Sequence, residues 1–281
     1  MADGDFFVRI WGARGSLPAC SGQASSFGCA TPCVEVRCGN RTFVLDAGSG
    51  IFPLGQEMLA GDSRELDLLF THCHYDHIEG LPFFRPLHSR DWTARIWSGH
   101  LGGRTTTAEM IAGYMREPYF PVGPDCFAAD LAFNDFAAGD VIAAGDGVRI
   151  RTIGLNHPGG AVGYRFEYRG RSFCLITDTE HVPGVPDGAI LSFIAGADVV
   201  IYDSAYSDEE FKAYVGFGHS TWQEGMRLCD AAGVDQFIAF HHQPEKTDAA
   251  LEAVDAALRQ ARPNSRLARE SMIIYPGRKM S

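Results

Sequence analysis

The sequence predicts an α/β protein that folds as one domain over residues 1–281. Short segments rich in Val, Ile and Phe are typical of β-strands and dominate early in the chain. Longer segments with polar capping residues are typical of helices and interleave with the strands later. No internal repeat and no long Pro/Gly/Ser linker divides the chain, so we expect a single domain.

Each predicted element is bounded by its apolar pattern. The predicted strands are Phe6–Trp11, Val34–Val36, Thr42–Leu45, Leu66–Phe70, Ala94–Trp97, Val148–Gly154, Gly163–Tyr168, Ser172–Ile176, Val199–Tyr202 and Gln236–Phe240. The predicted helices are Thr105–Met115, Ser220–Ala232 and Thr247–Gln260, with Ser220 and with Thr247 or Asp248 as N-caps.

The composition is that of an ordinary globular protein, with 46% hydrophobic and 21% charged residues. The net charge of -11 argues against a large nucleic-acid surface, because such surfaces are built from Lys and Arg. The chain has no run of about 18 apolar residues and no signal-peptide pattern. We therefore expect a cytoplasmic protein that does not bind membranes.

Eight cysteines are spread along the chain, and some lie on apolar runs, as buried thiols usually do. The spacing of Cys29 and Cys33 resembles half of a zinc knuckle. Because no clean second pair follows, we do not expect a structural zinc there.

Polar residues follow six of the predicted strands at the point where each strand ends. Strand ends in a packed sheet lie near one another, so we expect these side chains to meet at one edge. They are Asp46, the cluster that begins at His72, His157, Asp178, Asp203 and His241.

The segment His72-Cys73-His74-Tyr75-Asp76-His77 holds four candidate metal ligands within six residues. Imidazole and carboxylate groups are suitable ligands for zinc, manganese and iron. Together with the later strand-end residues, they exceed the needs of one four-coordinate ion. We therefore expect two divalent metal ions per chain, with zinc favoured and manganese or iron as alternatives.

The His-x-His-x-Asp-His string, with Asp46 before it and His157, Asp178 and His241 after it, resembles the metallo-β-lactamase superfamily. The segments 7–16, 76–84 and 177–180 resemble the branch that contains ribonuclease Z and the cyclic-nucleotide or small cyclic phosphodiesterases. The resemblance covers nearly the whole chain and implies a four-layer αββα sandwich with mixed sheets and outer helices. One departure lies at Cys29 and Ala30, where the branch usually has a Gly-Asn pair.

The resemblance implies a role for each matching residue. His72, His74 and His157 would hold one ion, Asp76, His77 and His241 would hold the other, and Asp178 would bridge them. Asp46 would support the site. At His241-His242 either ring could be the ligand; His241 is preferred because it follows the strand directly, and His242 would then support the site or face the substrate.

The string Gly218-His219-Ser220-Thr221 resembles a Gly-His-Ser-Thr string of the phosphodiesterase branch. Hydroxide held between two ions could attack a phosphoryl group, and the leaving alkoxide then needs a proton donor. We expect His219 to be this general acid, oriented by Asp203, and count Asp76 as catalytic through its metal. The alternative is that His219 only precedes a helix and Asp203 is structural.

Residues from about 88 to 140 form a stretch that is too long for a plain loop. Its aromatic residues suit a cap that selects a small substrate beside the metal cleft. The alternative is that Tyr119 and Phe120 pack in the core. His181 lies three residues after Asp178 and could face the same cleft.

The leading hypothesis is a metal-dependent phosphodiesterase that acts on a small or cyclic phosphodiester, and family analogy suggests a homodimer. The alternatives are a ribonuclease Z-like tRNA 3′ endonuclease, a lactone or thioester hydrolase, and a non-catalytic ligand-binding protein. The acidic charge argues against nucleic acid as a partner. A lactone or thioester substrate leaves His219 and Asp203 unexplained.

Overall fold

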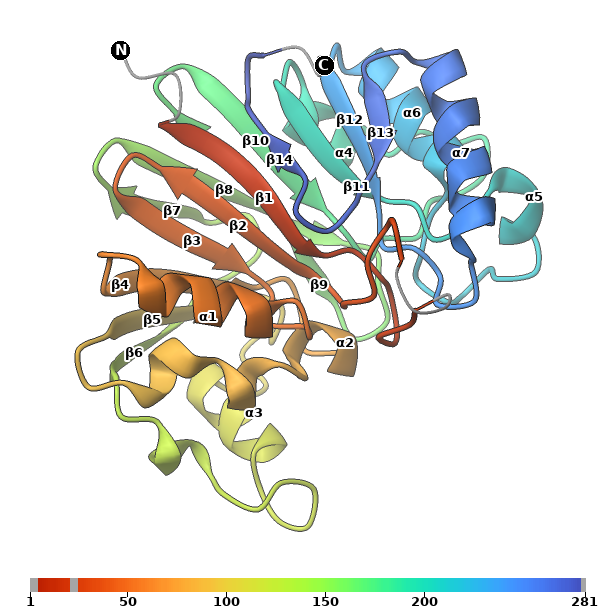
Figure 1. The fold of residues 1–281 in the computed structure, drawn as a ribbon. Coiled ribbons are helices and arrows are strands. Elements are labelled where there is room, and N and C mark those ends of the chain that lie inside the picture. Colours follow the sequence, from red (N-terminus) through yellow and green to blue (C-terminus); the bar gives the residue numbers. More distant parts are fainter. Residues whose placement is uncertain (1–4, 21–24, 279–281) are drawn as a thin grey trace.

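A computed structural model of the protein describes residues 5–20 and 25–278. Two seven-stranded mixed sheets pack face to face, and helices cover the outer face of each sheet (Figure 1). The expected four-layer αββα sandwich is therefore confirmed.

The first sheet has the order β14-β1-β2-β3-β4-β5-β6. Its strands from β14 to β3 are antiparallel to their neighbours, and those from β3 to β6 are parallel. The bounds are β1 (Phe6–Gly12), β2 (Cys33–Cys38), β3 (Arg41–Leu45), β4 (Glu65–Phe70), β5 (Thr93–Ser98), β6 (Asp130–Asp135) and β14 (Ile273–Ile274).

The second sheet has the order β13-β12-β11-β10-β9-β8-β7. Strands β10 to β13 are parallel, whereas β7 to β10 are antiparallel to their neighbours. The bounds are β7 (Val141–Gly145), β8 (Val148–Leu155), β9 (Ala161–Tyr168), β10 (Arg171–Ile176), β11 (Val199–Asp203), β12 (Gln236–Phe240) and β13 (Ser265–Leu267).

The helices lie in the connections between strands. They are α1 (Ile51–Ala60), α2 (Tyr75–Ile78), α3 (Thr107–Tyr114), α4 (Gly188–Ile194), α5 (Asp208–Phe211), α6 (Trp222–Ala231) and α7 (Asp248–Ala261), with 3₁₀ turns at η1 (Leu81–Phe83), η2 (Arg85–His88) and η3 (Pro124–Cys126). Every helix of the described ranges is too short or too polar to cross a lipid bilayer.

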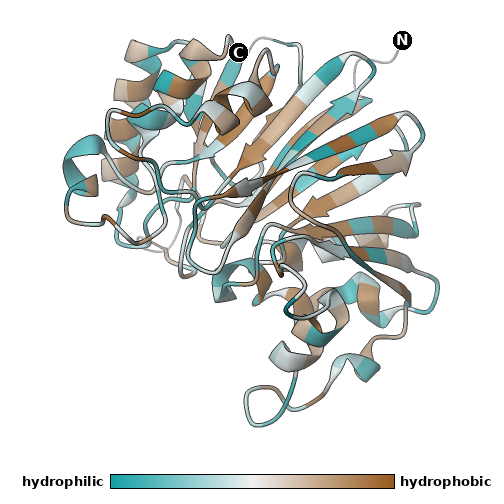
Figure 2. Cartoon of the chain, turned by 180° about the vertical axis from the view of Figure 1, so that it is seen from behind, coloured by the Kyte–Doolittle hydropathy of each residue, from teal (hydrophilic) through white to brown (hydrophobic). Residues whose placement is uncertain are grey.

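Three apolar layers hold the sandwich together. The central layer lies between the two sheets, and one outer layer lies on each side, beneath α1 and α3 and beneath α4, α6 and α7. Every residue of β11 and β12 is buried, as expected for strands covered on both faces, and Figure 2 shows apolar residues along the strands of the interior. Burial on both faces explains why these strands are continuous apolar runs rather than alternating ones.

The three predicted helices are confirmed with shifted ends, but the prediction of Ser220 as an N-cap was wrong. Thr106, Thr221 and Thr247 cap α3, α6 and α7, each accepting a backbone N–H through its side chain. Helix α1 was not predicted because it contains Pro53 and Gly55, which are poor helix formers. A Cβ at Gly55 would lie 2.9 Å from the ring of Phe84, so close packing requires glycine there.

The segment of about 88 to 140 contains β5, α3 and β6, and two of these elements are strands of the first sheet. Residues 99–129 connect β5 to β6, and their helix α3 packs against the outer face of these two strands. Within them the side chain of Tyr119 is 80% exposed, whereas the ring of Phe120 packs 5.9 Å from that of Phe83. A cap role is therefore confined to residues 99–129 and remains a proposal.

Removing an aromatic ring from the central apolar layer should greatly lower the stability of the protein. Phe166 is fully buried, and its ring lies 5.3 Å from Phe43 and 6.1 Å from Phe173. We expect Phe166→Ala to lower the free energy of unfolding by about 3–5 kcal/mol in urea titrations, because it leaves a cavity between the sheets. Phe133→Ala, on edge strand β6 and 38% exposed, is the matched control and should cost within about 0.5 kcal/mol. Equal losses in both variants would contradict this account of the core.

Candidate metal centre

The parallel strands of both sheets deliver polar residues to one edge of the sandwich. In the first sheet Leu45 pairs with Leu69, so Asp46 and the segment from Thr71 leave the sheet side by side. In the second sheet the paired strands β10, β11 and β12 end just before or at Asp178, Asp203 and His241. His157 follows β8, which runs in the same direction as β10. The structure thus brings the strand-end residues together.

Three of these residues have a left-handed backbone, which is uncommon for residues other than glycine. The φ angle is 63° at Asp46, 59° at Asp178 and 66° at His241. Such conformations cost about 1–3 kcal/mol each and persist only where the surrounding structure fixes them. At all three positions the turn comes directly after a strand and contributes a side chain to the same cluster.

The first group of candidate ligands consists of His72, His74 and His157, whose ring nitrogens lie within 4.8 Å of one another. His157 Nε2 is 3.0 Å from His74 Nδ1. His72 Nε2 is buried and has no hydrogen-bond partner among the described residues. A buried nitrogen without a proton donor or acceptor beside it is costly unless a cation occupies the space, so this group fits a metal ion.

The second group consists of Asp76, His77 and His241. Nε2 of His241 lies 3.2 Å from Asp76 Oδ2 and 3.4 Å from His77 Nε2. The neighbouring His242 lies outside the group, because its Nε2 donates to the carbonyl of Ala268 at 2.9 Å. Of the two adjacent rings, only His241 faces the other candidate ligands.

The carboxylate of Asp178 lies between the two groups. Its Oδ1 is 3.8 Å from both His72 Nε2 and His157 Nε2, and 3.4 Å from His241 Nε2. Its Oδ2 is 3.3 Å from His77 Nε2. Asp178 is therefore the one carboxylate of the described cluster within 4 Å of ring nitrogens of both groups.

Hydrogen bonds on the far side of two rings fix which nitrogen faces the cluster. Asp46 accepts hydrogen bonds from Thr71 and lies 2.8 Å from His77 Nδ1, and His157 Nδ1 donates to the carbonyl of Gly218 at 2.7 Å. Carbonyl and carboxylate partners of this kind orient histidines that bind metals. Asp46 thus lies between Thr71 and His77 on the side of the His77 ring that faces away from the other candidate ligands.

The electrostatics of the cluster are dominated by burial and by close opposite charges. Burial works against ionisation of Asp178, but His241, His77 and His72 outweigh it and hold its pKa well below the usual range. Burial and the nearby positive charge of His77 lower the pKa of His72 well below its usual value. Asp178, Asp76 and Asp46 instead outweigh burial and raise the pKa of His77 well above its usual value. His72 is thus already in the neutral state that a divalent metal requires, whereas a metal bound at His77 would displace a proton.

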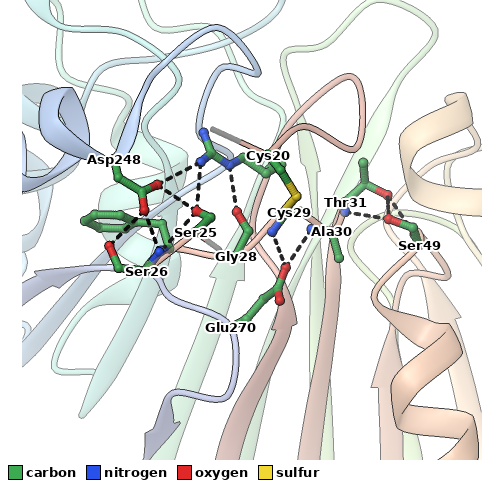
Figure 3. The surroundings of a disulfide bond; sticks show 12 residues. Cys20, Ser25, Ser26, Gly28, Cys29, Ala30, Thr31, Ser49, Asp248 and Glu270 are labelled. Carbon is green, nitrogen blue, oxygen red and sulfur yellow. Dashed lines mark hydrogen bonds and ion pairs between the residues drawn. A yellow bond between two sulfur atoms is a disulfide. The ribbon is translucent and has the colours of Figure 1, made fainter. Parts of the chain in front are cut away.

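The segment after β1 closes the cluster from one side. The amide of Ser16 donates to Asp76 Oδ2 at 2.7 Å, and a Cβ on Gly15 would lie 2.3 Å from the ring of His241. A disulfide joins Cys20 to Cys29 in the same segment (Figure 3). Sequence reasoning gave no pairing for these cysteines, although Cys29 stands where the family pattern departs.

Glu270 holds the Cys29 end of this segment. Its carboxylate accepts the backbone N–H groups of Cys29 and Ala30 at 2.5 and 2.6 Å, as Figure 3 shows. Charge-assisted bonds to two consecutive amides are strong. The backbone at Cys29 and Ala30, where the sequence departs from the family pattern, is thus held by a residue that lies 240 positions after Ala30 in the chain.

His219 lies beside the cluster and is oriented by Asp203. Its Nδ1 is 2.9 Å from Asp203 Oδ2 and 3.7 Å from Asp178 Oδ1, and its ring stacks on His241 with centroids 4.7 Å apart. Burial disfavours the charged ring, but Asp203, Asp178 and Asp76 outweigh it and raise the pKa of His219 to about 9. With Nδ1 bonded to Asp203, Nε2 is the nitrogen left to face a substrate.

Glu180 is a supporting residue that sequence reasoning missed. Its carboxylate accepts the N–H groups of Gly216 and Gly218, each at 2.8 Å, and so holds the loop that leads to His219. Its own backbone is tied to Asn156, next to His157. The signal in the sequence was its place in segment 177–180, two residues after Asp178, but that segment assigned it no role.

Two other histidines differ in their surroundings. His181 Nδ1 is bonded to Ser220 Oγ at 2.8 Å, and its ring stacks on Phe211, so it packs against α5 and belongs to none of the described ligand groups. His100 is buried, and neither of its ring nitrogens has a hydrogen-bond partner among the described residues. Burial and the nearby Arg104 lower the pKa of His100 to about 4.

Gly218 packs so closely against His157 that a side chain at this position would displace the histidine ring. A Cβ at Gly218 would lie 2.4 Å from His157 Nδ1, whereas one at Gly216 would meet nothing within 4 Å, although both glycines have positive φ. We expect Gly218→Ala to displace the ring and to reduce bound metal, measured by mass spectrometry of the purified protein, at least about tenfold. Gly216→Ala shares the backbone strain without the clash and should retain most of the metal. Equal metal content in the two variants would show that the contact with His157 is unimportant.

Comparisons with known proteins agree with this geometry. A family profile described as a β-lactamase superfamily domain matches residues 41–242. The ribonuclease Z of Mycobacterium marinum is 25% identical over 236 residues, covering 76% of this chain and 81% of that protein. The crystal structure of a diphosphatase from the PhnP family superposes with a TM-score of 0.71 at 16% identity, covering 98% of this chain and 100% of the other. Human tRNase Z, short form, superposes with a TM-score of 0.66 at 18% identity, covering 95% and 98%.

The profile spans β3 to β12, the histidine cluster and the later strand-end residues, and the sandwich architecture agrees with the structural neighbours. The chain therefore belongs to the metallo-β-lactamase superfamily of hydrolases, in the branch that contains ribonuclease Z.

Proposed function

We propose that the protein is a phosphodiesterase that uses two divalent metal ions to hydrolyse a small or cyclic phosphodiester. The observation that carries the proposal is the arrangement around Asp178. Two groups of three candidate ligands share this carboxylate, and the His219–Asp203 pair lies beside it. A metal site alone would suit many hydrolases, whereas the added proton donor suits a substrate with a poor leaving group.

The donor set fits two ions, with zinc favoured over manganese or iron. His72, His74 and His157 would hold one ion, Asp76, His77 and His241 the other, and Asp178 both. Bound at these positions, the ions would supply a hydroxide nucleophile near neutral pH and polarise a phosphoryl oxygen. Asp46 and Gly218 would keep the ring orientations of His77 and His157 through the transition state.

His219 would donate the proton to the leaving alkoxide. Asp203 is fully buried and accepts the N–H of Ser220 and of Ala205 in addition to its bond with His219, so its own position is fixed. The carboxylate favours the protonated ring and holds its Nδ1 away from the cleft. The alternative of a plain helix-terminal histidine fits less well, because the N-cap of α6 is Thr221 and His219 lies outside the helix.

A small substrate is favoured by charge and by the cap. The net charge of -11 opposes the approach of a long polyanion, and residues 99–129 would restrict the space beside the cleft. The similarity to ribonuclease Z keeps tRNA 3′ cleavage as the second candidate. Assays on a tRNA precursor, on cyclic nucleotides, and on lactone and thioester substrates would separate these classes, and no turnover on any would favour a binding role.

Two further expectations from the sequence, a homodimer and a cytoplasmic location, stay predictions. Disulfides are rare in the reducing cytosol. If the protein resides there, we expect Cys20 and Cys29 to be reduced during part of its lifetime, and alkylation of freshly lysed cells would report their state.

Because Asp178 lies between both groups of candidate ligands, replacing it should lower the amount of bound metal. We expect Asp178→Asn to lower bound metal from about two ions to one or fewer per chain, and to reduce bis(p-nitrophenyl) phosphate hydrolysis at least about 100-fold with either zinc or manganese. The control is Asp198→Asn, which removes an equal charge from a carboxylate that bonds Ser172 in the same sheet. If Asp178→Asn retains full activity and metal, the proposed function is wrong.

The role of His219 predicts a dependence on the leaving group. We expect His219→Ala to slow hydrolysis of a diester with an alkoxide leaving group by about 10²–10⁴-fold. The same change should affect a p-nitrophenyl diester much less, because nitrophenolate leaves without a proton, and metal content should stay at its wild-type level. If the rate falls equally on both substrates, His219 does not donate the proton and has a binding or structural role instead.

A further inference from the structure

A second pocket, of about 690 Å³, lies at the opposite end of the second sheet from the metal centre. Gln236 lines this pocket, and β12 runs from Gln236 to Phe240, next to His241. At about 3.3 Å per residue the strand separates the two places by roughly 16 Å. The pocket is therefore distinct from the cleft that holds the candidate metal ligands.

The lining of this pocket is strongly cationic. Four arginines and one acidic residue, Asp255, line it. The chain as a whole carries a net charge of -11, so this concentration of positive charge is local. The four are Arg259, Arg266, Arg269 and Arg278.

Carboxylates nearby do not neutralise all of these groups. Arg269 is paired with Glu252 and lies 3.6 Å from Asp255, whose carboxylate also accepts the N–H of Leu267. Asp255 is thus already engaged. A carboxylate partner for Arg259 or Arg266 would have to come from outside the pocket.

Arg259 and Arg266 lack such a partner. Arg266 donates only to the backbone carbonyls of Pro263 and Ser265, and Arg259 has no hydrogen bond or ion pair within residues 5–20 and 25–278. Burial and the charge of Arg259 lower the pKa of Arg266, which reflects two like charges held near each other. An anion between them would relieve this repulsion.

The guanidinium groups and the volume of the pocket suit a small ligand that carries a phosphate. Guanidinium groups bind phosphate oxygens through two parallel hydrogen bonds. The guanidinium of Arg278 lies 4.7 Å from the ring centroid of Tyr275, and the buried amide of Gln236 donates to the carbonyls of both residues. This support fixes the backbone of the wall, and the volume is in the range of small-molecule sites, about 300–1,000 Å³.

We propose that this arginine pocket, defined by Arg259, Arg266, Arg269 and Tyr275, binds a small phosphorylated ligand of nucleotide size. The site is separate from the metal centre and does not depend on the proposed phosphodiesterase activity. Its concave shape and limited volume favour a small anion over a nucleic-acid strand, which would require an extended cationic track.

The test uses the metal-loaded protein and isothermal titration with inorganic phosphate, pyrophosphate and AMP. Wild-type protein is compared with Arg259→Gln/Arg266→Gln, which removes two positive charges from the pocket. The matched control is Arg149→Gln/Arg151→Gln, which removes two charges from β8, where both arginines face Glu167. Hydrolysis of bis(p-nitrophenyl) phosphate is measured in all three proteins, so that loss of the metal centre is recognised separately.

We expect the pocket variant to lose one binding event, or to bind pyrophosphate and AMP at least tenfold more weakly, with unchanged hydrolysis and an unaffected control variant. Equal binding by the pocket variant and wild type would overturn the proposal, as would equal weakening in both variants. A further arm uses a short single-stranded RNA. If RNA binding depends on Arg259 and Arg266 while none of the small anions binds, the pocket is part of a nucleic-acid surface and the small-ligand proposal is wrong.

Discussion

The structure depends on the crowding of ionisable groups around Asp178. Ring nitrogens of four histidines lie within 3.8 Å of this one fully buried carboxylate, without counting His219. Such a cluster is stable only if opposite charges compensate one another within it, because solvent cannot. This arrangement requires unfavourable backbone conformations, namely the left-handed turns at Asp46, Asp178 and His241. It also requires glycine at position 15, where a Cβ would clash with the ring of His241.

The second sheet separates two kinds of electrostatic environment. At the carboxyl end of its parallel strands, carboxylates and imidazoles form an anionic site suited to cations. At the other end of β12, arginines form a cationic site suited to anions. Parallel strands allow this separation, because the loops at their carboxyl ends and those at their amino ends lie on opposite sides of the molecule.

Much of the fold and of the candidate site could be predicted from the sequence because the signals are local. An apolar run followed by a polar residue marks both a buried strand and its functional end, as at Leu66–Phe70 and His72. What could not be predicted depends on distant contacts. Glu180 lies in segment 177–180, but its role appears only when Gly216 and Gly218 fold back onto it. Short edge strands such as β13 have too few residues to show a pattern and form because a neighbour is present.

The two halves of the chain contribute different ligands to the same cluster. His72, His74, Asp76 and His77 come from the first sheet, whereas His157, Asp178 and His241 come from the second. An ion bound by ligands from both halves would cross-link them. Its binding free energy would therefore include the free energy of docking one sheet on the other. A nascent chain could then gain this stabilisation only after β12 and His241 have left the ribosome, so the site could form only once most strands of the second sheet have been synthesised.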